Sequence, residues 1–272
     1  KLPKGKMLRS KLILGIAGVS EESINLCSII EMIHAASLLH DDVIDDALSR
    51  RGKQSLNAIY GNKSSIMFGD ILYSKAFFEL TKLDNAIASE ISNAVVKLSV
   101  GELMDVQMGE SFNTDKSLYM KMIYKKTASL IESSAKAAAI LSSRDVAKFE
   151  TYGKNLGLAF QIVDDILDVT QDAKKLGKPN MNDFVEGKTT LPYIYAYEAV
   201  DDQKKEKLRS LFKVKCDQAQ ENWLKDILYS SGAIEKSIKE AKNLGYIAIE
   251  AVENEDVSKL QDVVRDMIER EF

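Results

Sequence analysis

The chain has 272 residues, of which 37 are Lys or Arg and 41 are Asp or Glu, so its net charge is −4. No basic stripe dominates the sequence, and nucleic acid is therefore not expected as the main partner. The two cysteines are far apart, which argues against a disulfide framework and favours a reducing, cytoplasmic location. The sequence shows no run of 18 apolar residues and no signal peptide, so no transmembrane segment is expected.

The apolar residues follow a helical pattern along nearly the whole chain. Hydrophobic residues make up 45% of the sequence, whereas there are only 14 Gly and 3 Pro. This pattern predicts an all-α fold in a single domain over residues 1–272. Because the sequence begins at Lys1 rather than Met, we also expect an N-terminal segment to precede it. The predicted helices cover residues 8–18, 21–46, 64–82, 84–110, 115–142 and 143–170, and further helices follow with interruptions near 201, 215, 231 and 253.

Short polar residues mark the predicted helix starts. Ser20 is followed by two glutamates and is a good N-cap, and Asp84 and Thr114 are expected to cap later helices. Some glycines, by contrast, interrupt helical patterns, which costs each helix up to about 1 kcal/mol. We expect these glycines to mark close helix packing: Gly69, Gly101, Gly153 and Gly157.

Four carboxylates gather at the end of the second predicted helix. Residues 38–46 read LLHDDVIDD and are followed by RRG at residues 50–52. Asp41 and Asp45 are four residues apart and so lie on one helix face, where like charges repel by roughly 0.2–0.5 kcal/mol. The apolar neighbours indicate that this is not simply a solvated face. A cation is therefore expected to compensate for the carboxylates.

A partial copy of this motif, FQIVDDILD, returns at residues 160–168. An acidic helix end or an exposed face would explain either copy alone, but it explains two copies in apolar helices poorly. Mg²⁺ is typically bound through one or two carboxylates together with substrate phosphates. If the two helices face each other across a cavity, metal ions between them could bind a diphosphate. The predicted metal ligands are Asp41, Asp42, Asp45, Asp164, Asp165 and Asp168.

Cations follow both motifs. Arg50 and Arg51 come directly after the first motif, while Lys178 and Lys188 lie in the long loop at residues 171–190. Departure of a diphosphate develops negative charge, which metal ions and Lys or Arg side chains stabilise. A long loop in a compact domain is often functional. For the isolated lysines, a solvated surface position remains the alternative.

The segment DDVIDDALSRRG resembles the first aspartate-rich motif, DDxxDxxxxRRG, of the trans-isoprenyl diphosphate synthases, and FQIVDDILD resembles their second motif. The resemblance extends over nearly the whole chain and is strongest to the long-chain heptaprenyl and octaprenyl synthases. It implies an all-α bundle of about ten or more helices around a deep central cavity. It also implies a magnesium-dependent, head-to-tail condensation of isopentenyl diphosphate onto an allylic diphosphate such as farnesyl diphosphate. A homodimer, a peripheral membrane contact for product release and a quinone side chain as the destination of the product are further expectations.

The resemblance also implies diphosphate contacts. Arg50 would bind the allylic diphosphate, and Arg51 would bind isopentenyl diphosphate. Lys6 and Arg9 match the family's Gly-Gly-Lys-x-x-Arg-Pro segment and would bind isopentenyl diphosphate together with His34, although a histidine in an apolar helix can also be a buried structural residue. The N-terminal segment departs from the family pattern at Lys4, Met7 and Ser10.

Further residues match family elements beside the allylic site. Lys126 and Thr127 match a Lys-Thr pair, and Gln161 matches a Phe-Gln element. Lys178 and Lys188 match two family lysines that follow the second motif. Without the family pattern, Lys126 would be an ordinary surface lysine and Gln161 a helix-packing polar residue.

Ala36 and Ser37 lie five and four residues before Asp41, about one helical turn, ~5.4 Å, from the carboxylates. Short-chain relatives often carry an aromatic floor at this level, whereas both side chains here are small. The resemblance therefore implies a product longer than farnesyl, in the heptaprenyl-to-octaprenyl range. The alternatives are that both residues only pack helices and that the product is farnesyl or geranylgeranyl diphosphate.

Other classes of protein fit the sequence less well. Glu31 and His34 form one Glu-x-x-His unit, but a di-iron bundle needs a second unit that the sequence lacks. The Gly187-Lys188-Thr189 segment lacks the first glycine and the preceding strand of a P-loop. A terpene cyclase does not need cations for a second diphosphate. A non-catalytic subunit of a heteromeric synthase does not need two complete aspartate motifs, and a turnover assay on the chain alone would test that alternative.

Overall fold

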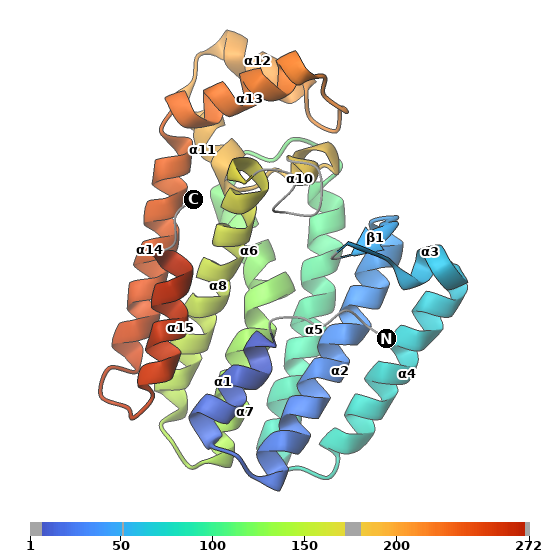
Figure 1. Ribbon diagram of the computed structural model, residues 1–272, viewed down its shortest axis with the longest axis vertical. Helices are drawn as coiled ribbons and strands as arrows, with labels where there is room; N and C mark the ends of the chain where they lie inside the picture. The colour runs from blue at the N-terminus through green and yellow to red at the C-terminus, as the bar shows by residue number, and fades with distance from the viewer. Residues whose placement is uncertain (1–6, 51, 172–180, 270–272) are drawn as a thin grey trace. The chain divides into compact units, whose positions relative to one another are not determined.

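The computed structural model describes residues 7–50, 52–171 and 181–269 (Figure 1). Within these ranges the chain is almost entirely helical, and the strands β1 (Ser49–Arg50) and β2 (Lys53–Gln54) form one antiparallel hairpin. The predicted all-α fold with ten or more helices is therefore confirmed. The chain divides into two compact units. The first comprises the described parts of residues 1–97, 130–153 and 251–260, and the second those of residues 98–129, 154–250 and 261–272. The single domain and the central cavity stay predictions.

The first unit is built around α2 (Glu21–Ile44), which packs against α1 (Leu8–Ala17) and runs beside α4 (Asn62–Leu80) (Figure 1). The helix starts as predicted at Ser20, whose hydroxyl accepts a hydrogen bond from the Ser23 N–H at 3.1 Å, while the Ser23 hydroxyl accepts one from the Ser20 N–H at 2.8 Å. This reciprocal pair satisfies two of the free N–H groups at the helix start. The core face of α2 carries fully buried apolar side chains: Leu26, Ile29, Ile30 and Ile33.

Among the described helices, α2 is the one that is long and apolar enough, by length and composition, to cross a membrane. Half of its most apolar 18-residue window is buried within the protein. Core helices of globular proteins pass the same test, and α2 packs against α1 and α4 as a core helix does. The observation is therefore weak evidence for a membrane span.

The first unit also holds α3 (Leu56–Tyr60), the start of α5 (Asn85–Met108), nearly all of α7 (Ser129–Leu141) and the start of α8 (Val146–Thr170). The remaining parts of α5 and α8 belong to the second unit. That unit adds α6 (Lys116–Ile123), a π-helical turn η1 (Tyr124–Ala128), α10 (Asn182–Val185), α11 (Leu191–Ala199), α12 (Asp202–Ser210), α13 (Gln218–Ser230), most of α14 (Ala233–Ala251) and most of α15 (Ser258–Ile268).

The structure corrects three local predictions. Residues 116–141 form a continuous helical run as predicted, but the run contains the unpredicted π-helical turn η1 between α6 and α7. Thr114 is not the N-cap of α6; the Asp115 carboxylate accepts hydrogen bonds from the Ser117 and Leu118 N–H groups and caps the helix instead. The connection after the first motif contains the hairpin and α3, which the apolar pattern did not reveal. Part of the predicted long loop, residues 172–180, lies outside the described residues.

Close helix packing at the four interrupting glycines is confirmed. A Cβ atom on Gly157 of α8 would lie 2.5 Å from the Cα atom of Ala128 in η1, which is closer than real Cβ atoms approach. A Cβ on Gly69 of α4 would lie 2.3 Å from the His40 ring of α2. In the same way, the backbone of Lys126 approaches Gly101, and that of Glu132 approaches Gly153.

We expect Gly157→Ala to lower the free energy of unfolding by about 1–3 kcal/mol, because the added methyl group would push α8 away from η1. Thr151→Ala, an exposed position on the same helix, should change it by less than about 0.5 kcal/mol. Thermal and urea unfolding of both variants would measure the difference. Equal stability of the two variants would contradict the packing role of Gly157.

Candidate active site

The first aspartate motif ends α2 with an ion pair. The Asp42 side chain is buried, and Arg50 Nε donates a hydrogen bond to Asp42 Oδ1 at 2.6 Å. Burial raises the pKa of Asp42, and the charge and hydrogen bond of Arg50 offset part of this effect. Asp41 and Asp45 are partly exposed, and the Asp45 N–H closes the last turn on the Asp41 carbonyl at 2.8 Å. The motif thus has one carboxylate fixed inside the protein and two nearer to solvent.

The hairpin holds Arg50 in this position. Arg50 pairs with Lys53 across β1 and β2, directly after the turn that leaves α2. Asn57 Nδ2 donates to the Asp42 carbonyl at 2.9 Å and ties α3 to the end of α2. Asn57 was not predicted as a site residue, since a single Asn in a stretch predicted to be a connection gives no signal of such a contact. Arg51 lies outside the described residues.

The second aspartate motif lies on the part of α8 that belongs to the second unit. Asp164 is exposed, whereas Asp165 is only 3% exposed. Two neutral donors reach Asp165: the Tyr119 hydroxyl donates to Oδ2 at 2.6 Å, and Gln161 Nε2 donates to Oδ1 at 2.8 Å. The Thr127 hydroxyl donates in turn to Gln161 Oε1 at 2.7 Å. A continuous hydrogen-bond chain therefore joins three predicted site residues, and its fourth member, Tyr119, was not predicted.

A further carboxylate, Asp183, lies against this motif. Its N–H donates to Asp168 Oδ2 at 3.2 Å, so α10 is anchored on the buried Asp168. Burial and the nearby charge of Asp183 raise the pKa of Asp165 well above its usual value, although the hydrogen bonds from Tyr119 and Gln161 oppose this. Asp183 was not predicted because it lies within the predicted loop and has no repeated spacing. It makes the second motif more acidic than its three aspartates alone.

Lys126 is placed by η1 and pairs with two carboxylates of α5. Its Nζ atom donates to Asp105 Oδ2 at 2.5 Å and lies 2.8 Å from Glu102 Oε2. Burial lowers the pKa of Lys126, but the charges of Asp105 and Glu102 outweigh it and hold the pKa well above its ordinary value. Single π-helical turns inside helices are frequent at functional sites. The alternative of an ordinary surface lysine is wrong for Lys126.

The other predicted residues occupy separate positions. His34 is partly exposed on α2, and its carbonyl accepts a hydrogen bond from the Ser37 hydroxyl at 2.9 Å. Ala36 and Ser37 are both buried, with exposures of 0% and 5%. Arg9 lies on α1, and Lys188 pairs with Glu186 at 2.9 Å. Lys6 and Lys178 lie outside the described residues.

The carboxylates fit magnesium in chemical type. Among the described residues, no group of three or more His, Cys, Asp or Glu side chains forms a ready metal cage. Mg²⁺ does not require one, because it commonly keeps several waters and uses one or two carboxylates with substrate phosphates. The partly exposed Asp41 and Asp45 and the exposed Asp164 can offer oxygen atoms in this way. The two motifs belong to different units, and their opposition across a cavity stays a prediction.

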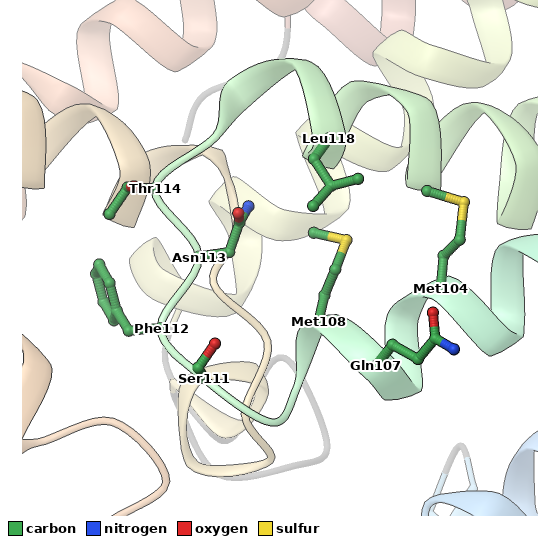
Figure 2. A pocket seen from close by; sticks show the side chains of 8 residues that line it. All are labelled: Met104, Gln107, Met108, Ser111, Phe112, Asn113, Thr114 and Leu118. Atoms are coloured by element: carbon green, nitrogen blue, oxygen red, sulfur yellow. The ribbon is translucent and has the colours of Figure 1, made fainter.

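A pocket of about 340 Å³ lies in the second unit, where the end of α5 leads into α6 (Figure 2). Met104, Met108 and Leu118 gather on one side of it, and Phe112 lies on the other side (Figure 2). Among the described residues, the lining includes neither a carboxylate nor a cation. The pocket is therefore unsuited to holding a metal–diphosphate complex by itself.

Comparisons with known proteins identify the family of the chain. The crystal structure of an octaprenyl pyrophosphate synthase from Helicobacter pylori has 46% sequence identity to this chain and a TM-score of 0.94. The match covers 99% of this chain and 90% of that chain. A short chain isoprenyl diphosphate synthase from Methanothermobacter thermautotrophicus is 38% identical, covering 76% of this chain and 67% of the relative. A chloroplastic solanesyl-diphosphate synthase from Oryza sativa is 35% identical, covering 98% of this chain and 70% of the relative. The family model described as polyprenyl synthetase matches residues 1–229, so the chain belongs to the polyprenyl synthetase family.

Proposed function

We propose that this prenyltransferase condenses isopentenyl diphosphate head-to-tail onto an allylic diphosphate, farnesyl diphosphate being the expected primer, with Mg²⁺ as cofactor. The observation that carries the proposal is the hydrogen-bond chain Thr127–Gln161–Asp165–Tyr119. It joins the Lys-Thr, Phe-Gln and second aspartate elements into one set and leaves Asp164 exposed beside them. The ion pair of Asp42 with Arg50 organises the first motif in a comparable way.

In this mechanism, Asp41, Asp45 and Asp164 would hold Mg²⁺ against the allylic diphosphate. The metal would stabilise the charge that develops on the leaving diphosphate. Arg50 and Lys126 would bind the same diphosphate through charge-assisted hydrogen bonds. With Mg²⁺ bound in this way, the proposed active site gathers cations where the negative charge appears.

The allylic carbon–oxygen bond then breaks, and its electron pair leaves with the diphosphate. The double bond of isopentenyl diphosphate attacks the allylic cation and forms the new carbon–carbon bond. Arg9 and His34, with Lys6 and Arg51, would hold isopentenyl diphosphate during this step. In the part of the chain that the structure describes, no side chain is an obvious base, so the lost proton is assigned to the departing diphosphate.

The product is proposed to be a long all-trans polyprenyl diphosphate, in the heptaprenyl-to-octaprenyl range. The relative named octaprenyl pyrophosphate synthase supports this length, as do the small side chains of Ala36 and Ser37. The likeness to a short chain isoprenyl diphosphate synthase keeps a short product as the second candidate. A quinone side chain is the proposed destination.

A homodimer is supported by exposed apolar residues on two helices. On α4, Met67, Ile71 and Phe78 are each more than half exposed and follow one stripe at helical spacing. On α5, Val96 and Leu103 are similarly exposed seven residues apart. Large exposed apolar residues in such stripes are typical of protein–protein interfaces. A second copy of the chain is the partner that we propose for the α4 and α5 stripes.

The free cysteines Cys27 and Cys216 support the proposed cytoplasmic location.

The metal role is tested by comparing two adjacent aspartates. Asp164→Asn should lower turnover about 10²-fold or more with excess Mg²⁺, while the melting temperature stays near that of the wild type because the side chain is exposed. Asp165→Ala should lower turnover and, in addition, lower the free energy of unfolding by about 1–3 kcal/mol, because it leaves the buried Tyr119 hydroxyl without its acceptor. Asp266→Asn, an exposed acid on α15, is the control. Wild-type turnover in Asp164→Asn would refute the metal role.

Product length is tested with farnesyl and isopentenyl diphosphates and Mg²⁺, followed by chromatographic sizing. The wild type should make heptaprenyl-to-octaprenyl products. Ala36→Phe should give shorter products while the first condensation continues, because a ring would cross the path of the tail. Ala35→Phe, one position along α2 and partly exposed, should keep the wild-type length. If Ala36→Phe makes the wild-type product at a comparable rate, Ala36 does not face the growing tail.

The dimer surface is tested by sedimentation. Met67→Glu combined with Ile71→Glu should shift the protein to monomer, because two carboxylates would be buried in an apolar contact. Asn62→Glu adds one carboxylate at an exposed position at the start of α4 and should leave the dimer intact. A wild-type chain that sediments as a monomer at micromolar concentration would contradict the proposal.

A further inference from the structure

Glu102 and Asp105 of α5 have no role in the function proposed so far, yet they form a compact charge cluster with Lys126 in the second unit. The Lys126 ammonium lies 2.5 Å from Asp105 Oδ2 and 2.8 Å from Glu102 Oε2. Glu102 is only 7% exposed. Among the described residues, no hydrogen bond reaches its two buried oxygens, so the charge of Lys126 is what compensates them.

The backbone around Lys126 is fixed from the same side. A Cβ atom on Gly101 would lie 2.3 Å from the Lys126 backbone nitrogen, so α5 and η1 are in direct backbone contact there. Residues 102 and 105 are three apart on α5 and lie on one face. Both carboxylates therefore flank the point where the Lys126 side chain leaves η1. Both the backbone and the ammonium of Lys126 are held by one helix segment.

The cluster lies close to a second predicted diphosphate ligand. The positive charge of Lys188 acts to lower the pKa of Lys126, against the effect of the two carboxylates. Two lysines of like charge thus lie within interaction range in the same unit. Such an arrangement is unfavourable in the free enzyme unless acids compensate it, and an incoming diphosphate would relieve it further.

We propose that Glu102 and Asp105 are positioning residues that hold the Lys126 ammonium ready for the allylic diphosphate. This inference rests on the proposed function. An ammonium has three N–H donors, and in Lys126 one of them donates a hydrogen bond to Asp105. Fixing a long, flexible lysine before the substrate arrives removes an entropy cost from the binding and ionisation steps.

The test uses steady-state kinetics of the full chain with farnesyl and isopentenyl diphosphates and Mg²⁺. Asp105→Asn and Glu102→Gln keep the size of each side chain and remove only its charge. We expect each to raise the KM for farnesyl diphosphate and lower kcat, with a combined loss of about 10- to 100-fold in kcat/KM. The KM for isopentenyl diphosphate should change by less than about 2-fold.

The chain provides a matched control on the same helix. Glu90 of α5 and Glu150 of α8 both pair with Lys136, at 3.0 and 3.1 Å, so Lys136 is also a lysine between two carboxylates. Lys136 has no predicted contact with substrate. Glu90→Gln should therefore leave both KM values and kcat within about 2-fold of the wild type. An equal kinetic loss in Glu90→Gln would mean that the effect is structural and would overturn the proposal.

A double-mutant cycle with Lys126→Ala separates positioning from any other role. If the two acids act through Lys126, Asp105→Asn and Glu102→Gln should change kcat/KM by less than about 2-fold in the Lys126→Ala background. The same loss in both backgrounds, or no loss in the wild-type background, would overturn the proposal. Should one single variant fail to fold, the other completes the cycle. Wild-type turnover tests the proposed function separately, because it does not depend on either acid variant.

Discussion

A carboxylate can be buried only where hydrogen bonds or opposite charges replace its water, and this constraint shapes the proposed active site. Asp165 accepts hydrogen bonds from the Tyr119 hydroxyl and the Gln161 amide, so its burial fixes α6 and α8 against each other. The Gln161 side chain also accepts a hydrogen bond from Thr127 in η1. The buried aspartate thus sets the positions of several groups that the proposed reaction needs.

The two aspartate motifs compensate their buried carboxylates in different ways. Asp42 is compensated by a cation, Arg50, which a hairpin presents to it, whereas Asp165 is held by neutral donors. Asp42 is buried in the first motif, and Asp165 and Asp168 are buried in the second, whereas Asp41, Asp45 and Asp164 lie closer to solvent. In the proposed function the buried members organise each motif, and the more accessible members are the proposed metal ligands. At Lys126 the charges are reversed, since two acids compensate one partly buried cation.

Periodicity and motif spacing predicted the helices, the packing glycines and the two aspartate motifs, because these features repeat at fixed intervals. The η1 turn escaped prediction, since its residues have the same apolar pattern as an α-helix and only the hydrogen-bond register differs. Tyr119, Asp183 and Glu102 were missed for another reason. Each reaches the site through tertiary contacts between distant segments, and a single sequence carries no signal of such contacts. Thr114 failed as a cap because its neighbour Asp115 offers a better acceptor at the same helix start.

The central claim is that the exposed aspartates of both motifs bind Mg²⁺ and one allylic diphosphate together. A crystal structure of the chain with Mg²⁺ and an unreactive thiolodiphosphate analogue of farnesyl diphosphate tests it most directly. The account predicts Mg²⁺ on Asp41, Asp45 and Asp164, bridged by the diphosphate, with Arg50 and Lys126 in contact with its oxygens. A diphosphate bound away from either motif, or metal on one motif only, would contradict the account.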